Sequence, residues 1–185
     1  MKSRFFALLC ILIILSVTGF YGWLLWQNSR ENAAKDVISD ENLQIDNILV
    51  QKAQRKMFLR HGEQVIYTYN ISLGRNPAGA KIREGDKKTP EGKYYIVSHN
   101  PHSAYHLSLK ISYPTETQKN AAHENGYSAG GDIMIHGFPN KTPEFFFVAV
   151  HKMRDWTAGC IAVTNREIEQ IYRLVQDGTP ITIEP

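Results

Sequence analysis

The stretch of sequence that decides the fold is Trp156-Thr157-Ala158-Gly159-Cys160-Ile161-Ala162-Val163. Its thiol stands alone, because the chain's other cysteine, Cys10, lies in an apolar N-terminal segment. A single thiol in a segment with export features has no disulfide partner within its domain, which favours nucleophilic or redox chemistry over a structural role. The stretch therefore indicates a reactive cysteine.

A histidine stands at the end of a second short apolar run, Ile133-Met134-Ile135-His136-Gly137. A neighbouring imidazole can take the proton of a thiol and make it a nucleophile. Cys160 follows His136 by 24 residues, which leaves room for a helix between them, and Gly137 permits a sharp departure of the backbone. The pair predicts cysteine-dependent acyl transfer, although spacing alone equally allows a packed histidine and a small buried cysteine.

The glycine before the cysteine indicates a second feature of an acyl-transfer site, a place for the substrate's oxyanion. Gly159 would let the backbone approach a substrate closely, and amide N–H groups near Cys160 are candidates for an oxyanion hole.

The rest of the chain predicts a mainly β domain with short helices. Residues 74–92 are rich in Gly, Pro and charge and indicate a long, functional loop. Strands are expected at 46–53, 56–60, 65–71, 93–97, 105–111 and 181–183, with a hairpin turn at His61-Gly62-Glu63. Short helices are expected after the capping boxes that begin at Thr115 and Thr164, and after Thr142 with Pro143 at the first helical position.

The N-terminus predicts export. Residues 5–26 contain no charged side chain, and this run is long enough to cross a bilayer as a helix. Lys2 and Arg4 precede it, which favours a cytoplasmic N-terminus. We expect residues 1–26 to be an uncleaved inner-membrane anchor, 27–45 a polar tether and 46–185 a periplasmic domain. A cleaved signal peptide, which would leave a soluble periplasmic domain, is the alternative.

The net charge and the spacing of the histidines give no reason to expect nucleic acid, a metal or a cofactor. The chain has 21 Lys and Arg against 18 Asp and Glu, and without Lys2 and Arg4 its net charge falls to +1, so nothing favours nucleic acid. His99, His102, His106 and His123 match no familiar ligand spacing, so neither a metal nor a cofactor is predicted. We expect His151 and Arg154 at an exposed helix end.

Three ordered motifs resemble the L,D-transpeptidase catalytic domain, also called the YkuD domain. The similarity covers roughly residues 47–185. The motifs are Ile133-Met134-Ile135-His136-Gly137 followed by Thr157-Ala158-Gly159-Cys160-Ile161, the Thr89-Pro90-Glu91-Gly92 segment before a strand, and the ending Gly178-Thr179-Pro180-Ile181-Thr182-Ile183.

This resemblance implies a β-sandwich-like fold and an enzyme of cell-wall remodelling that acts on peptidoglycan stem peptides. By position, Cys160 corresponds to the nucleophile and His136 to the general base, with Gly159, Thr157 and Gly137 shaping the site. The implied reaction is attack on the amide between the diamino acid at stem position three and terminal D-alanine, through a thioester that an amine or water resolves.

The motif departs from the family pattern at two positions. Many members carry a histidine where this chain has Ala158, and an arginine where it has Ala162. The stretch looks closer to a Gram-negative subgroup that includes an enzyme detaching lipoprotein from the wall. Two alternatives therefore remain. One is a hydrolase of the same fold that detaches wall-attached lipoprotein, a possible partner, or trims stem peptides, and the other is a non-catalytic wall-binding module.

Overall fold

The computed structural model describes residues 18–23, 26–27 and 44–185, apart from the side chain of Lys152. Residues 18–23 and 26–27 are helical, and residues Gln44–Pro185 form a compact unit of their own. In these described parts of the chain, no helix is both long and apolar enough to cross a membrane. The anchor expected at 1–26 and the tether at 27–45 fall mostly outside the described residues.

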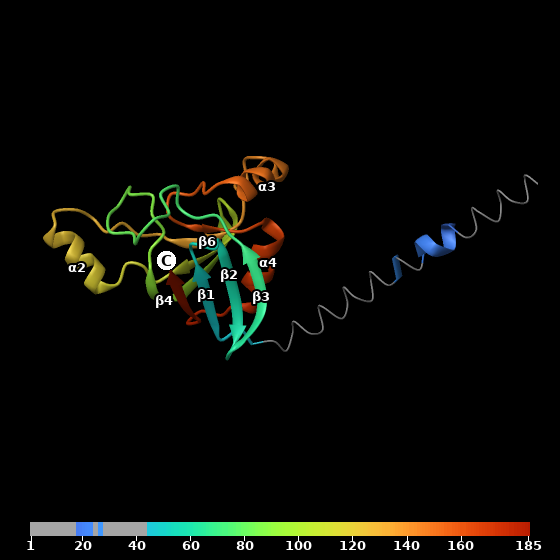
Figure 1. The fold of residues 1–185 in the computed structure, drawn as a ribbon, viewed down its shortest axis with the longest axis horizontal. Helices are drawn as coiled ribbons and strands as arrows, with labels where there is room; N and C mark the ends of the chain where they lie inside the picture. The colour runs from blue at the N-terminus through green and yellow to red at the C-terminus, as the bar shows by residue number, and fades with distance from the viewer. Residues whose placement is uncertain (1–17, 24–25, 28–43) are drawn as a thin grey trace, which may run out of the picture. The chain divides into compact units, whose positions relative to one another are not determined.

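Eight strands and three helices build the unit Gln44–Pro185 (Figure 1). The strands are β1 (Asn47–Gln51), β2 (Lys56–His61), β3 (Gln64–Asn70), β4 (Gly92–Ser103), β5 (His106–Ile111), β6 (Met134–His136), β7 (Ile161–Ala162) and β8 (Pro180–Glu184). The helices are α2 (Glu116–Glu124), α3 (Glu144–Met153) and α4 (Asn165–Leu174). The prediction of a mainly β domain with short helices is confirmed.

The strands form one continuous sheet in the order β3-β2-β1-β8-β4-β5-β6-β7. The long strand β4 links the two halves, since its first residues pair with β8 and its later residues with β5. The sheet bends far enough for its two edges to meet, because Ser72, just after β3, exchanges backbone hydrogen bonds with Ala162 of β7. The expected sandwich is thus a single curled sheet.

The core lies where alternating apolar residues of the strands meet α4. In β1 and β2, Ile48, Val50, Met57 and Leu59 are buried on one face, as the period of two for strands requires. The helix α4 packs on β5 and β6 with Ile168, Ile171 and Leu174 buried at helical spacing.

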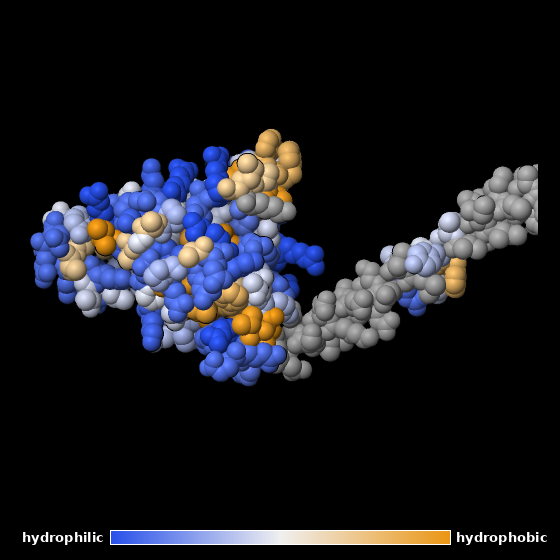
Figure 2. Space-filling model, in the orientation of Figure 1, coloured by the Kyte–Doolittle hydropathy of each residue, from blue (hydrophilic) through white to orange (hydrophobic). Residues whose placement is uncertain are grey.

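Local sequence signals account for several element ends. Both predicted capping boxes are present, with Thr115 bonded to Gln118 and Thr164 to Glu167. Pro143 is the N-cap of α3 rather than its first helical residue, so that prediction was off by one position. The helix α3 keeps an exposed apolar side that includes Phe145 and Phe146. Figure 2 shows an apolar patch at the place of α3 in Figure 1.

Candidate active site

The register of β6 and β7 brings His136 and Cys160 to the same face of the sheet. The two strands are parallel, with Ile135 opposite Ile161, and both isoleucine side chains are fully buried. Because side chains alternate along a strand, the residues that flank these isoleucines point to the other face. His136 follows Ile135 and Cys160 precedes Ile161, so both side chains reach one cleft.

The cleft has a volume of about 690 Å³, which suits a peptide-sized ligand. It lies against β6, the segment before β7, and the side of α3 that carries Phe147 and Val150. Its lining residues are Arg75, Asn100, Ser103, Ala104, Tyr105, Asp132, Met134, His136, Pro139, Phe147, Val150, Arg154, Trp156, Thr157, Ala158 and Cys160. Apolar and aromatic walls around a few polar groups are typical of a substrate site.

His136 is held in one tautomer by its neighbour. Its side chain is 4 % exposed, and Nδ1 donates a hydrogen bond to the Gly137 carbonyl oxygen at 2.7 Å, which leaves Nε2 as an acceptor. The rings of Tyr105 and Trp156 pack against the imidazole, with centroids 4.5 and 5.7 Å away. Burial lowers the pKa of His136 to about 4, against the opposing effect of the Gly137 carbonyl. The imidazole is therefore neutral at pH 7 and able to accept a proton.

Cys160 is partly exposed to the cleft, and its thiol donates to the carbonyl oxygen of Asp132 at 3.5 Å. Burial raises the pKa of the Cys160 thiol above its usual range, although a hydrogen bond from the Met134 backbone opposes this. In this conformation the thiol of Cys160 and the imidazole of His136 are therefore both neutral at pH 7.

Thr157 and Gly159 shape the turn that carries the cysteine. The Thr157 hydroxyl donates to the Cys160 carbonyl oxygen at 2.8 Å and accepts from the Gly159 amide at 3.1 Å. Gly159 has a φ of +139°, and a Cβ there would lie 2.7 Å from the Lys88 carbonyl oxygen. Only glycine fits this position without displacing the turn. Since the Gly159 amide is bonded to Thr157, its part in this conformation is to form the turn.

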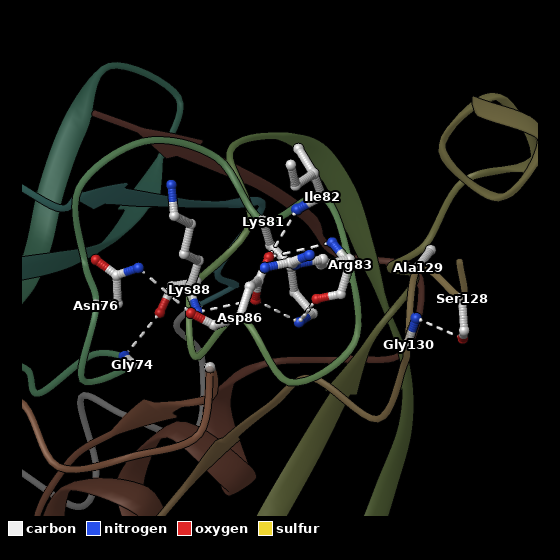
Figure 3. A network of polar contacts seen from close by, with 12 residues as sticks. Gly74, Asn76, Lys81, Ile82, Arg83, Asp86, Lys88, Ser128, Ala129 and Gly130 are labelled. Carbon is white, nitrogen blue, oxygen red and sulfur yellow. Dashed lines mark hydrogen bonds and ion pairs between the residues drawn. The ribbon is translucent and has the colours of Figure 1, made fainter. Parts of the chain in front are cut away.

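A buried ion pair holds the long loop against this turn. Asp86 accepts hydrogen bonds from Lys81 Nζ at 2.8 Å and from the backbone amides of Ile82, Arg83 and Lys88 (Figure 3). The side chains of Lys81 and Asp86 are only 4 % and 6 % exposed. The loop so fixed presents the Lys88 carbonyl to Gly159, and therefore supports the backbone beside Cys160.

The other predicted residues have structural partners. Gly137 donates its amide to the carbonyls of Tyr105 and Leu107, and it packs against Asn165 so closely that a Cβ would lie 2.7 Å from Oδ1. The prediction for His151 was wrong, because it is buried and shares a 3.0 Å hydrogen bond with the Ser72 hydroxyl.

No metal site stands out in the described part of the chain, where no three His, Cys, Asp or Glu side chains are grouped to hold an ion. Of the loosely spaced histidines, His99 pairs with Asp177 and His106 with Glu169, both at 2.7 Å.

Sequence reasoning missed much of the cleft, including Tyr105, Trp156, Arg75 and Arg154. Trp156 stands in the cysteine motif itself, and an aromatic so close to a nucleophile is a signal that could have been used. Tyr105 lies in the turn between β4 and β5, where no local pattern marks it. Arg75 belongs to the loop that was predicted to be functional, but nothing in that loop singles it out. Arg154 was expected at an exposed helix end, and it is exposed, but it also lines the cleft.

The chain is similar in sequence and in fold to known bacterial proteins. The chain is 27% identical over 181 residues to the Escherichia coli (strain K12) protein named "Putative L,D-transpeptidase YafK", covering 93% of this chain and 64% of that protein. The crystal structure of the helical cell shape determining protein Pgp2 (K307A mutant) from Campylobacter jejuni superposes with a TM-score of 0.57 at 25% identity. The match covers 77% of this chain and 48% of Pgp2.

A more distant structure shows the same fold. The L,D-transpeptidase from Mycobacterium smegmatis has a TM-score of 0.50 at 13% identity, over 75% of this chain and 58% of that one. The model of the YkuD family, described as the L,D-transpeptidase catalytic domain, matches residues 46–183, which include His136 and Cys160. This chain therefore belongs to the YkuD family of L,D-transpeptidase catalytic domains.

Proposed function

We propose that the domain carries out cysteine-dependent acyl transfer on peptidoglycan stem peptides. The observation that carries the proposal is that His136, the last residue of β6, and Cys160, the residue before β7, line one peptide-sized cleft. Family membership supports the substrate class, and the description of Pgp2 as a cell shape determining protein supports a role in wall remodelling.

In the proposed reaction, the Cys160 sulfur attacks the amide carbonyl carbon while His136 Nε2 takes the thiol proton. The tetrahedral intermediate collapses, the C–N bond breaks, and the protonated His136 returns the proton to the departing amine. A thioester remains. An acceptor amine then attacks it, His136 takes the amine proton, and the thiolate leaves to be reprotonated.

The oxyanion would form beside the turn that carries the cysteine. The backbone amide of Cys160 is the donor we propose for it, since the neighbouring Gly159 amide is already bonded to Thr157. The Thr157 hydroxyl, bonded to the Cys160 carbonyl, fixes the peptide plane that follows the nucleophile.

Hydrolysis is the second candidate reaction. Ala158 lines the cleft as a small, exposed side chain, and Ala162 is fully buried between Ser72 and His136 in the sheet. Neither position offers a polar group to bind an acceptor. Water attack on the same thioester, including release of wall-attached lipoprotein, is therefore a specific alternative, and a non-catalytic wall-binding module is a third.

The proposed location is the periplasm, with the domain anchored to the inner membrane by residues 1–26. The uncharged run at 5–26 with Lys2 and Arg4 before it supports this.

The test is to incubate the chain from Gln27 to Pro185 with two wall preparations, one with covalently attached lipoprotein and one without. Mass spectrometry of the products distinguishes the candidates, with Cys160→Ala as the control. New crosslinks or exchanged terminal residues would establish transpeptidation, whereas lipoprotein released with a stem fragment would establish hydrolysis. A product that also forms with Cys160→Ala, or no product from either wall, would contradict the proposal and favour the binding module.

A further inference from the structure

The cleft contains two arginines and one acidic residue. Arg75 and Arg154 line it on the side of the cysteine turn, and Asp132 is its acidic residue. Asp132 is already paired, because Lys110 Nζ lies 2.6 Å from its carboxylate. Among the described residues, neither Arg75 nor Arg154 forms an ion pair with a carboxylate, so the cleft carries uncompensated positive charge.

The acid nearest to these arginines in sequence is engaged elsewhere. Asp155 accepts hydrogen bonds from Arg55 Nε and Nη2 at 3.0 and 2.8 Å, and from the backbone amide of Leu73 at 2.8 Å. Its side chain is 12 % exposed, so Arg55 holds it inward. The segment therefore presents Arg154 to the cleft without its neighbouring carboxylate.

The fold also sets the position of Arg75. Its backbone amide donates to the Thr157 carbonyl oxygen, and its Nε donates to the Trp156 carbonyl oxygen, both at 3.1 Å. The guanidinium is thus attached through Nε to the segment that carries Cys160, and none of the described residues is hydrogen-bonded to its two terminal nitrogens. Arg154 precedes Trp156 by two residues on the same segment and also lines the cleft.

We infer that Arg75 and Arg154 form a carboxylate-binding pair that selects peptides with a free carboxylate close to the amide under attack. A guanidinium recognises a carboxylate through two parallel hydrogen bonds, and a cleft with uncompensated charge raises the local concentration of anionic ligands. This inference rests on the proposed function, in which the ligand is a stem peptide. Such a peptide offers two carboxylates, one at its C-terminus and one on the side chain of its diamino acid.

The experiment measures binding, so that its outcome does not depend on turnover. Full-length Cys160→Ala protein in detergent is titrated calorimetrically with three versions of one stem tetrapeptide. The first has both carboxylates free, the second has a C-terminal carboxamide, and the third has an amidated diamino-acid side chain. The same titrations are made with Arg75→Gln and Arg154→Gln, and with Arg166→Gln, which replaces an exposed arginine on α4 outside the cleft, as the matched control.

Amidating the recognised carboxylate should weaken binding about tenfold in the parent protein, because a charge-assisted hydrogen-bonded pair is lost. Arg75→Gln or Arg154→Gln should weaken binding of the free acid to a similar extent and abolish the preference for it over the amide. Arg166→Gln should keep the full preference. The amide that removes the preference identifies which carboxylate is read.

Equal binding of all three peptides, or a preference for the free acid that survives both cleft substitutions, would overturn the inference. Either result leaves Cys160 chemistry intact, because acyl transfer is tested separately with the wild-type cysteine. Conversely, if the protein selects the free carboxylate but forms no product, the carboxylate-binding pair would stand and the proposed reaction would be rejected.

Discussion

The protonation state of single side chains governs how this cleft would work. Burial raises the pKa of the Cys160 thiol and lowers that of His136 to about 4, so both groups are neutral between pH 5 and 8. A preformed thiolate and imidazolium pair would need the opposite shifts. In the proposed reaction, the proton would therefore pass to His136 Nε2 during the attack rather than before it.

We therefore predict that alkylation of Cys160 by iodoacetamide is slow at neutral pH and rises about tenfold per pH unit toward pH 9, because only the thiolate reacts. Intact-mass measurement of the alkylated fraction over time gives the rate at each pH. His136→Gln should show the same profile, since a neutral imidazole does not stabilise a thiolate by charge. Cys160→Ser corrects for Cys10, and a rate that levels off between pH 5 and 7 would instead indicate an ion pair.

At the scale of elements, buried side chains hold the loop at 74–91. Asp86 accepts four hydrogen bonds, one of them from Lys81 Nζ, and these lower its pKa to about 2 against the opposing effect of burial. A second buried lysine, Lys52, donates to two carbonyl oxygens of the loop. Apart from an isolated bridge at Gly74, the loop contains no strand, so these side chains take the place of a backbone ladder. Its Lys88 carbonyl then limits where the Gly159 turn can lie.

Asp86→Asn should lower the free energy of unfolding by about 3–5 kcal/mol at pH 7, because it leaves the Lys81 ammonium buried without a counter-charge. Urea denaturation followed by circular dichroism measures this loss. Lys119→Gln, which breaks the exposed Lys119–Glu116 pair, is the control and should cost less than about 1 kcal/mol.

The same substitution has a pH signature. A carboxyl whose folded pKa lies below its usual 3.8 adds stability that is complete above that value and is lost as the pH falls toward 2. The difference between wild type and Asp86→Asn should therefore shrink below pH 4. A difference that stays constant down to pH 3, or that matches Lys119→Gln at pH 7, would show that the pair does not support the loop.

Sequence patterns predicted the elements that local chemistry determines. The capping boxes at Thr115 and Thr164 and the hairpin at Gly62 depend on residues a few positions apart, and the structure has all three. The strand β4 was expected to end at Val97 but continues to Ser103, since its polar second half is stabilised by pairing with β5 rather than by an apolar pattern. Long-range pairing of this kind leaves no local signal.

The same limit applies to the site. His136 and Cys160 were found because they stand in short motifs, and the structure brings both to one cleft. Arg75 Nε donates to the carbonyl oxygen of Trp156, 81 residues away along the chain. The composition of residues 74–92 predicted a functional loop, but which of its residues reaches the cleft follows from the closure of the whole sheet.

At the scale of the whole molecule, the last strand in sequence is internal to the sheet. The strand β8 lies between β1, to which it is parallel, and β4, to which it is antiparallel. Its Ile181 and Ile183 side chains are buried. The strand β8 therefore connects β1 to the long strand β4, although β1 and β4 come far earlier in the chain.

Deleting residues 179–185 should abolish cooperative unfolding. Burial of Ile181 and Ile183 contributes roughly 3–6 kcal/mol, and the deletion also removes the backbone partners of both β1 and β4. That loss approaches the whole stability of a domain, about 5–15 kcal/mol. Deleting residues 1–43 should leave the midpoint unchanged, because Gln44–Pro185 is a compact unit with its own core. Thermal unfolding of the two deletion variants is followed by far- and near-ultraviolet circular dichroism. A cooperative transition after the C-terminal deletion would show that the strands on either side of β8 hold together without it.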